Sequence, residues 1–156
     1  MKQLSVAHLT PLQLDYLVGI LEYPHLTWGD TIGLHWASRQ IVIPELPEPE
    51  CYYHPSSDWN TGGKIIECGN ITVIRCDDDY RIDAKGFTTD QRISVWGATT
   101  GQHGTHTSYE GEYYYPQYEI AESDIVYGKT PLIAAMRCYV ASKLGNMVEV
   151  PDDLID

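Results

Sequence analysis

The sequence lacks any apolar run long enough to cross a bilayer, and its first ten residues lack the apolar centre of a signal peptide. We therefore expect a cytoplasmic protein with no membrane association. Cysteine is scarce: four residues without a C-x-x-C pair exclude a disulfide-rich secreted scaffold and favour reduced thiols. The chain also lacks a nucleophile elbow and a His-Glu-x-x-His motif, so neither of these hydrolase classes is indicated.

Basic residues are few as well. Ten Lys and Arg residues stand against 22 Asp and Glu residues, which gives a formal net charge of -12. This balance argues against direct binding of nucleic acid through a broad basic face. The acids are grouped at 45–50, 77–79 and 152–156, a pattern more typical of solvated loops than of a DNA mimic, which spreads carboxylates along helices and strands.

What the sequence does contain is enough apolar material for a core. At 156 residues, with 43% hydrophobic and 21% charged residues, it is predicted to form one folded domain spanning 1–156. No internal repeat or linker interrupts it.

Two Thr-Pro helices are predicted near the ends of the chain. Thr10 and Gln13 have the spacing of a capping box around Pro11, and apolar residues then recur at helical intervals until Tyr23-Pro24. The segment 128–145 is the best-specified helix, with Thr130 as its N-cap and Gly145 as its left-handed end.

Between the helices the patterns predict short strands. Residues 39–44 are the cleanest strand, and 64–68 with 71–76 are predicted to form a hairpin around a Gly69-Asn70 turn. Residues 77–90 and 101–111 are predicted to be irregular because they are polar or rich in Gly, Thr and His. The predicted class is α+β: a compact domain with an antiparallel sheet, an N-terminal helix and a C-terminal helix.

The segment 51–63 is predicted to be a loop that carries groups able to grip a ligand. An indole with hydroxyls, a carboxylate and close-approaching glycines is how many proteins hold a base or a ribose phosphate. The alternative is structural, with Asp58 capping a turn and Trp59 filling the core. The candidate ligand-binding residues of this loop are Ser56, Ser57, Asp58, Trp59, Gly62 and Gly63.

Two cations of the last helix are further candidates. Gly128-Lys129-Thr130 is not a Walker A motif, because the required glycine is replaced by Ser123, but Lys129 at a helix start still attracts phosphate. Arg137 lies beside the apolar stripe, so it must find a carboxylate, a row of carbonyls or a bound anion.

Histidine patterns leave two alternatives open. Cys51-x-x-His54 with His103-x-x-His106 could bind zinc, although the flanking residues are unlike a zinc knuckle. His25 and His103 each begin a His-x-Thr/Ser-like triplet, the pattern of two-histidine phosphodiesterases. Short matches of this kind arise readily by chance, so we expect no metal and no cofactor.

Several segments carry a resemblance to a known family. P-S-S-D-W-N-T-G-G-K-I-I-E at 55–67 and the whole of 128–154 resemble the NinX-like family, small proteins of tailed bacteriophages and prophages. R-C-D-D-D-Y at 75–80, G-F-T-T-D-Q-R-I at 86–93 and W-G-A-T-T-G-Q-H-G at 96–104 are also similar. The resemblance covers roughly the last two thirds of the chain and implies a phage origin, with no established chemistry and no inherited residue roles.

Together these features suggest a non-enzymatic phage accessory protein that sequesters a nucleotide-derived immune signal of the host. The ligand-binding set adds His103, Lys129 and Arg137 to the loop residues above. The alternatives are an acidic inhibitor of a host protein and, less favoured, a phosphodiesterase that uses His25 and His103. A homo-oligomer would bring two copies of the loop together, but no heptad pattern supports one.

Overall fold

The computed structural model describes residues 1–78, 81–82, 88–89, 93–100, 105–110, 113–118 and 125–155, and only the backbone at 76–78, 81–82, 88–89, 93–95, 105–110 and 113–118. The helices are α1 (Pro11–Glu22), α2 (Trp59–Cys68) and α3 (Pro131–Leu144), with 3-10 turns η1 (Val6–His8) and η3 (Asp152–Leu154). The strands are β1 (Lys2–Ser5), β2 (Gly33–His35), β3 (Gln40–Val42), β4 (Tyr52–Tyr53), β5 (Ile71–Asp78), β6 (Arg81–Ile82), β7 (Thr88–Thr89), β8 (Ile93–Thr100), β9 (Thr105–Glu110), β10 (Tyr113–Tyr118), β11 (Val126–Gly128) and β12 (Met147–Val150). The predicted α+β class is confirmed.

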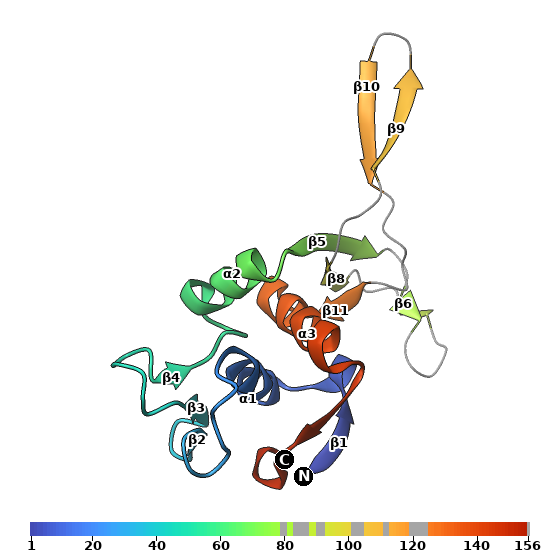
Figure 1. Ribbon diagram of the computed structural model, residues 1–156. Coiled ribbons are helices and arrows are strands. Elements are labelled where there is room, and N and C mark those ends of the chain that lie inside the picture. The colour runs from blue at the N-terminus through green and yellow to red at the C-terminus, as the bar shows by residue number, and fades with distance from the viewer. Residues whose placement is uncertain are drawn as a thin grey trace.

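Helix α3 lies at the centre of the fold (Figure 1). It packs against the sheet β11-β8-β5, and α1 and α2 also contact it. Its buried residues include Ala134, Ala135 and Met136, all with no exposed surface. The alanines permit a close approach, and a Cβ added at Gly128 would lie 2.4 Å from the backbone nitrogen of Ala134. Strand β11 can therefore reach this helix only with a glycine at its end.

The two predicted helix starts are confirmed in detail. Thr10 and Gln13 form the full capping box at the start of α1, and the hydroxyl of Thr130 accepts from the backbone nitrogen of Ile133 at the start of α3. Gly145 ends α3 with a φ of 84°. These ends form as predicted because each cap is a contact between residues close together in the sequence.

The ends of the chain are tied to one another. Strands β1 and β12 pair antiparallel, with Gln3 opposite Glu149, and the termini lie close together in Figure 1. The side-chain amide of Gln13 donates to the carbonyl of Leu154 at 2.9 Å. The first helix is thereby fixed to the C-terminal segment.

The remaining described strands pair with near neighbours. Strands β2, β3 and β4 form a small antiparallel sheet, β6 pairs with β7, and β9 pairs with β10. Ile41 and Ile43 from the β3 region are fully buried in the same core as α1. None of the described helices combines the length and apolarity that a bilayer crossing requires.

Three local predictions were wrong. Residues 59–68 form helix α2 where a loop and the first strand of a hairpin were expected. Residues 105–110 form strand β9 where an irregular segment was expected, and 77–90 contains the end of β5 together with β6 and β7. Polar or glycine-rich composition misled in each case, because pairing and packing partners override local propensity.

Helix α2 contains two central glycines, Gly62 and Gly63, which lie within the helix and not in a turn. A Cβ at Gly62 would lie 2.3 Å from the carbonyl oxygen of Pro55 and 2.7 Å from the Leu132 side chain. Gly62 is therefore needed for contact between α2, the preceding turn and α3. Gly63 has open space, with its nearest neighbour, a ring carbon of Trp59, at 4.0 Å.

Candidate functional site

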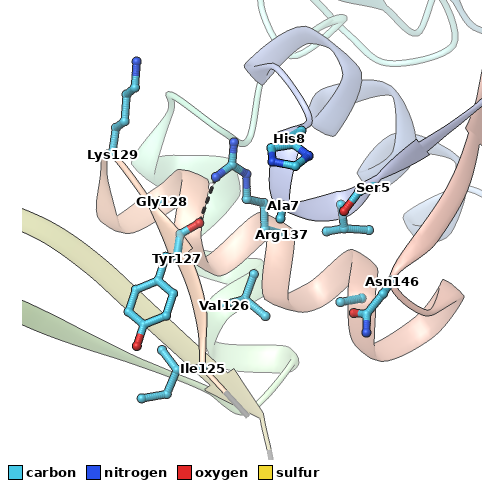
Figure 2. Close-up of a pocket in the computed structure, with 12 residues that line it drawn as sticks. Ser5, Ala7, His8, Ile125, Val126, Tyr127, Gly128, Lys129, Arg137 and Asn146 are labelled. Atoms are coloured by element: carbon cyan, nitrogen blue, oxygen red, sulfur yellow. Dashed lines mark hydrogen bonds between the residues drawn. The ribbon is translucent and has the colours of Figure 1, made fainter. Parts of the chain in front are cut away.

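A cleft lies between η1, β11 and α3 (Figure 2). Its volume is about 760 Å³. Three basic side chains line it, those of His8, Lys129 and Arg137, and no Asp or Glu is among its described lining residues. In a chain with a net charge of -12, this concentration of basic groups is a departure from the average surface. We call it the Arg137 cleft.

Arg137 is held by backbone carbonyls. Its Nη1 donates to the carbonyl of Tyr127 at 2.8 Å, and its Nη2 donates to the carbonyl of Leu9 at 2.9 Å. Its Nε is buried and has no hydrogen-bond partner among the described residues. Burial lowers the pKa of the guanidinium from its usual high value. Of the three partners that the sequence left open, the structure therefore provides the row of carbonyls.

This arrangement leaves Arg137 partly available. A guanidinium carries further N–H groups on Nη1 and Nη2 beyond those used for the two carbonyls. The side chain is half-buried, and Figure 2 shows it at the same end of the cleft as Lys129 and His8. Arg137 thus joins η1 to β11 and also presents positive charge to the cleft.

Lys129 occupies the junction between β11 and α3. It is exposed, and it directly precedes Thr130, the cap of α3. The amino end of a helix carries partial positive charge and unpaired N–H groups, which add to the charge of the lysine. Ser5 and Asn146 supply further polar groups to the cleft wall.

The predicted loop residues lie elsewhere, around the start of α2. Asp58 is the N-cap of α2 and accepts from the backbone nitrogens of Asn60 and Thr61. Burial raises the pKa of Asp58, but hydrogen bonds from Thr61 and Asn60 outweigh it, so the pKa is lowered overall. Trp59 is 59% exposed and does not fill the core, while Gly62 and Gly63 lie within the helix.

Two serines precede this helix with different surroundings. The backbone nitrogen of Ser56 donates to Oδ1 of Asp15 at 2.8 Å, and its hydroxyl donates to the carbonyl of Pro11 at 3.4 Å. Ser57 is exposed, and its hydroxyl donates to the carbonyl of His54 at 3.3 Å. The structure therefore brings Lys129 and Arg137 together, and none of residues 56–63 lines their cleft. His103 lies outside the described residues.

Sequence reasoning missed one buried acid, Asp15, and one histidine, His8. Asp15 is only 6% exposed, and burial raises its pKa to about 7, against the opposing effects of Ser56 and His54. Asp15 and His54 line a smaller cavity, and His8 lines the Arg137 cleft. Asp15 had a detectable signal, since it is a lone acid within the apolar stretch 14–18 of a helix. His8 had none, because only tertiary contacts bring it beside Arg137.

Neither of the histidine alternatives, zinc binding or a two-histidine phosphodiesterase, has a site among the described residues. In the part of the chain that the structure describes, no three residues among His, Cys, Asp and Glu come together as a metal site. Cys51 is buried, and His54 donates from Nδ1 to the carbonyl of Tyr52 at 2.7 Å. His25 pairs with Glu45 on the surface at 2.7 Å. The partner proposed for it, His103, is outside the described residues.

Comparison with known proteins now identifies the family. The sequence profile described as Bacteriophage P22, NinX matches residues 5–97, which is more than half of the chain. The chain therefore belongs to this phage family. The match includes 55–67 and also residues 5–50, which lie outside the segments that carry the resemblance, and it ends before 128–154. A search of curated proteins finds no match.

Proposed function

We propose that this member of the phage NinX family binds and sequesters a small phosphate-bearing, nucleotide-like molecule in the Arg137 cleft. The observation that supports the proposal is the charge of this cleft: Arg137, Lys129 and His8 line it without an acid, although the chain has more than twice as many acids as bases. Its volume of about 760 Å³ lies within the range of small-molecule sites.

The residues of the cleft suggest a division of roles. Lys129 and the amino end of α3 would hold a phosphate, and the remaining N–H groups of Arg137 would bind a second anionic oxygen. Val126, Ile125 and Ala141 offer an apolar wall for a base or a ribose. No nucleophile and base are paired in this set, which favours binding over turnover.

Sequestration of such a molecule suits a phage accessory protein. Nucleotide-derived immune signals are small and anionic, and a phage gains if they are held before they reach a host effector. We propose that the protein acts in this way in the cytoplasm of the infected cell, as a counter-defence factor.

Calorimetry with a panel of cyclic dinucleotides and ADP-ribose derivatives tests the proposal. We expect at least one to bind, and Lys129→Glu to weaken that binding by at least about tenfold, because a phosphate contact is replaced by repulsion. Lys64→Glu is the matched control, since Lys64 is an exposed lysine on α2 that does not line the cleft. Absence of binding across the panel, or equal losses in the two variants, would contradict the proposal.

A second candidate function is inhibition of a host protein. Two tryptophans favour it, because Trp36 is 65% exposed and Trp59 is 59% exposed, and exposed tryptophans are frequent anchors of protein interfaces. In this case a single host protein would be retained stoichiometrically from a lysate, and Trp59→Ser would release it while leaving nucleotide binding unchanged. Retention that does not depend on either tryptophan would argue against this function.

A further inference from the structure

A second cavity lies between α1, the β2–β3 turn and the residues that precede α2. Its volume is about 330 Å³. The residues with polar side chains that matter below are Asp15 on α1, Arg39 and Gln40 at the start of β3, and His54 and Ser57 before α2. None of them lines the Arg137 cleft. We call it the Asp15 cavity.

Asp15 supplies a buried acceptor. It is 6% exposed, and the backbone nitrogen of Ser56 donates to its Oδ1 at 2.8 Å. The side chain of Ser56 also interacts with Asp15 and lowers its pKa. A carboxylate has about four lone-pair sites for hydrogen bonds, so the contacts with Ser56 leave part of its capacity for a ligand. A ligand that enters the cavity and offers N–H groups would meet a desolvated acceptor, where a charge-assisted hydrogen bond is strong.

The other polar groups are mainly donors. Nδ1 of His54 donates to the carbonyl of Tyr52, which fixes the orientation of the ring. Nε2 is the ring nitrogen that this bond does not use. The side-chain amide of Gln40 can donate to a ligand carbonyl. Arg39 also lies over the indole of Trp36, with its Cζ 6.0 Å from the ring centroid, so an exposed aromatic face adjoins the residues of the cavity.

We propose that the Asp15 cavity binds the edge of an uncharged heterocycle that carries adjacent ring and exocyclic N–H donors beside a carbonyl, as guanine does. The carboxylate of Asp15 accepts the two N–H groups side by side, and Gln40 donates to the carbonyl. This pattern of one acceptor and neighbouring donors matches guanine and not adenine. The site goes beyond the proposed function, because it needs no phosphate and uses none of the residues of the Arg137 cleft.

The proposed binding depends on an ionised Asp15. Burial raises the pKa of Asp15 to about 7, so the acceptor form is largely absent at pH 5.5 and prevails at pH 8. The titratable groups that interact with Asp15 are His54 and the buried phenol of Tyr53, and Asp58 in turn interacts with His54. Arg39 lines the same cavity. Only a variant of Asp15 itself can therefore show that the pH dependence of binding comes from Asp15 and not from these other groups.

Calorimetry of the full chain with guanosine, inosine and adenosine tests the inference. We expect binding to decrease in that order, because inosine lacks the exocyclic amine and adenosine also lacks the ring N–H and the carbonyl. Guanosine should bind at least about tenfold more tightly at pH 8 than at pH 5.5. Asp15→Asn should weaken binding at pH 8 by at least about tenfold and remove the pH dependence.

Two further variants keep the test decisive. The amide oxygen of Asp15→Asn can still accept from Ser56, and circular dichroism reports whether the variant folds; if it does not, Gln40→Ala decides, with an expected loss of severalfold. Lys129→Glu should leave guanosine binding unchanged, whereas we expect it to weaken binding in the Arg137 cleft by at least about tenfold. Failure of guanosine to bind, equal binding of adenosine, or loss in Lys129→Glu would overturn the inference.

Discussion

Arg137 and Asp15 are two ionisable residues in apolar helices, and they have opposite fates. The guanidinium of Arg137 reaches two backbone carbonyls, on Leu9 and Tyr127, and the residue stays half-buried. The short side chain of Asp15 receives one backbone N–H, from Ser56, and is 6% exposed. The long side chain therefore keeps its charge and joins segments, whereas the short one has its pKa raised to about 7.

The largest test of this contrast is removal of the Arg137 guanidinium. Arg137→Met keeps the apolar stem but leaves the carbonyls of Leu9 and Tyr127 without their partner. We expect the free energy of unfolding to fall by about 3 kcal/mol, because each buried carbonyl loses a charged donor. Urea denaturation measures the change. Lys129→Met, at an exposed position in the same cleft, is the control and should change stability by less than about 0.5 kcal/mol.

The second test concerns the pH dependence that Asp15 confers. Its folded pKa of about 7 lies above the ordinary aspartate value of 3.8, so its contribution to stability is fully present below pH 3.8 and is lost as the pH rises through 7. We expect Asp15→Asn to be more stable than the natural chain at pH 8, by roughly 2 kcal/mol, since the buried charge is gone. Thermal unfolding of both proteins at several pH values measures this difference in stability. If the free energy of unfolding changed equally with pH in both proteins, Asp15 would be excluded as the source of the pH dependence.

A third test disturbs the turn that gives Asp15 its donor. Gly62→Ala should lower the free energy of unfolding by about 1 to 3 kcal/mol, because the new Cβ would meet the carbonyl of Pro55 at 2.3 Å, next to Ser56. Gly63→Ala is the matched control one residue further along α2. There the space is open, and we expect a gain of roughly 0.5 kcal/mol from improved helix propensity. Denaturation midpoints that move in the same direction would contradict the packing argument.

The smallest test compares Asp15 with an aspartate whose pKa is lowered. Asp58→Ala removes the N-cap of α2 and should cost about 1 kcal/mol at pH 7. Because the folded pKa of Asp58 lies below its ordinary value, its contribution is present above that value and is lost as the pH falls through the folded pKa. The cost of the variant should therefore shrink in acid, opposite to the effect of Asp15. A cost that is constant with pH would indicate that charge plays no part in the cap.

Part of the fold was accessible from the sequence because its signals are local. The caps of Thr10 and Thr130 and the end at Gly145 need only neighbours within a few residues, and all three were confirmed. Helix α2 was missed because Gly62 and Gly63 resemble a turn, while the contact that requires Gly62 comes from Pro55 and Leu132. Distant packing, not local propensity, determined that segment.

The candidate site residues likewise fall into a part that the sequence predicted and a part that it did not. Lys129 and Arg137 were identified from their places on a helix, and they do line one cleft. The loop residues Ser56 to Trp59 were grouped with them by composition, although the structure gives Asp58 to a cap and leaves Trp59 exposed. Chemical type alone does not tell which side chains share a cavity.

The sequence by itself determined the α+β class, the bracketing helices and their caps, and the relation to the phage family. Each depends on spacing along the chain. Only the tertiary structure decided which partners the ionisable groups of those helices meet, since the carbonyl of Leu9 lies 128 residues from Arg137 and Ser56 lies 41 residues from Asp15. Charge, burial and pKa depend on such distant contacts, and with them the two cavities in which ligands are proposed to bind.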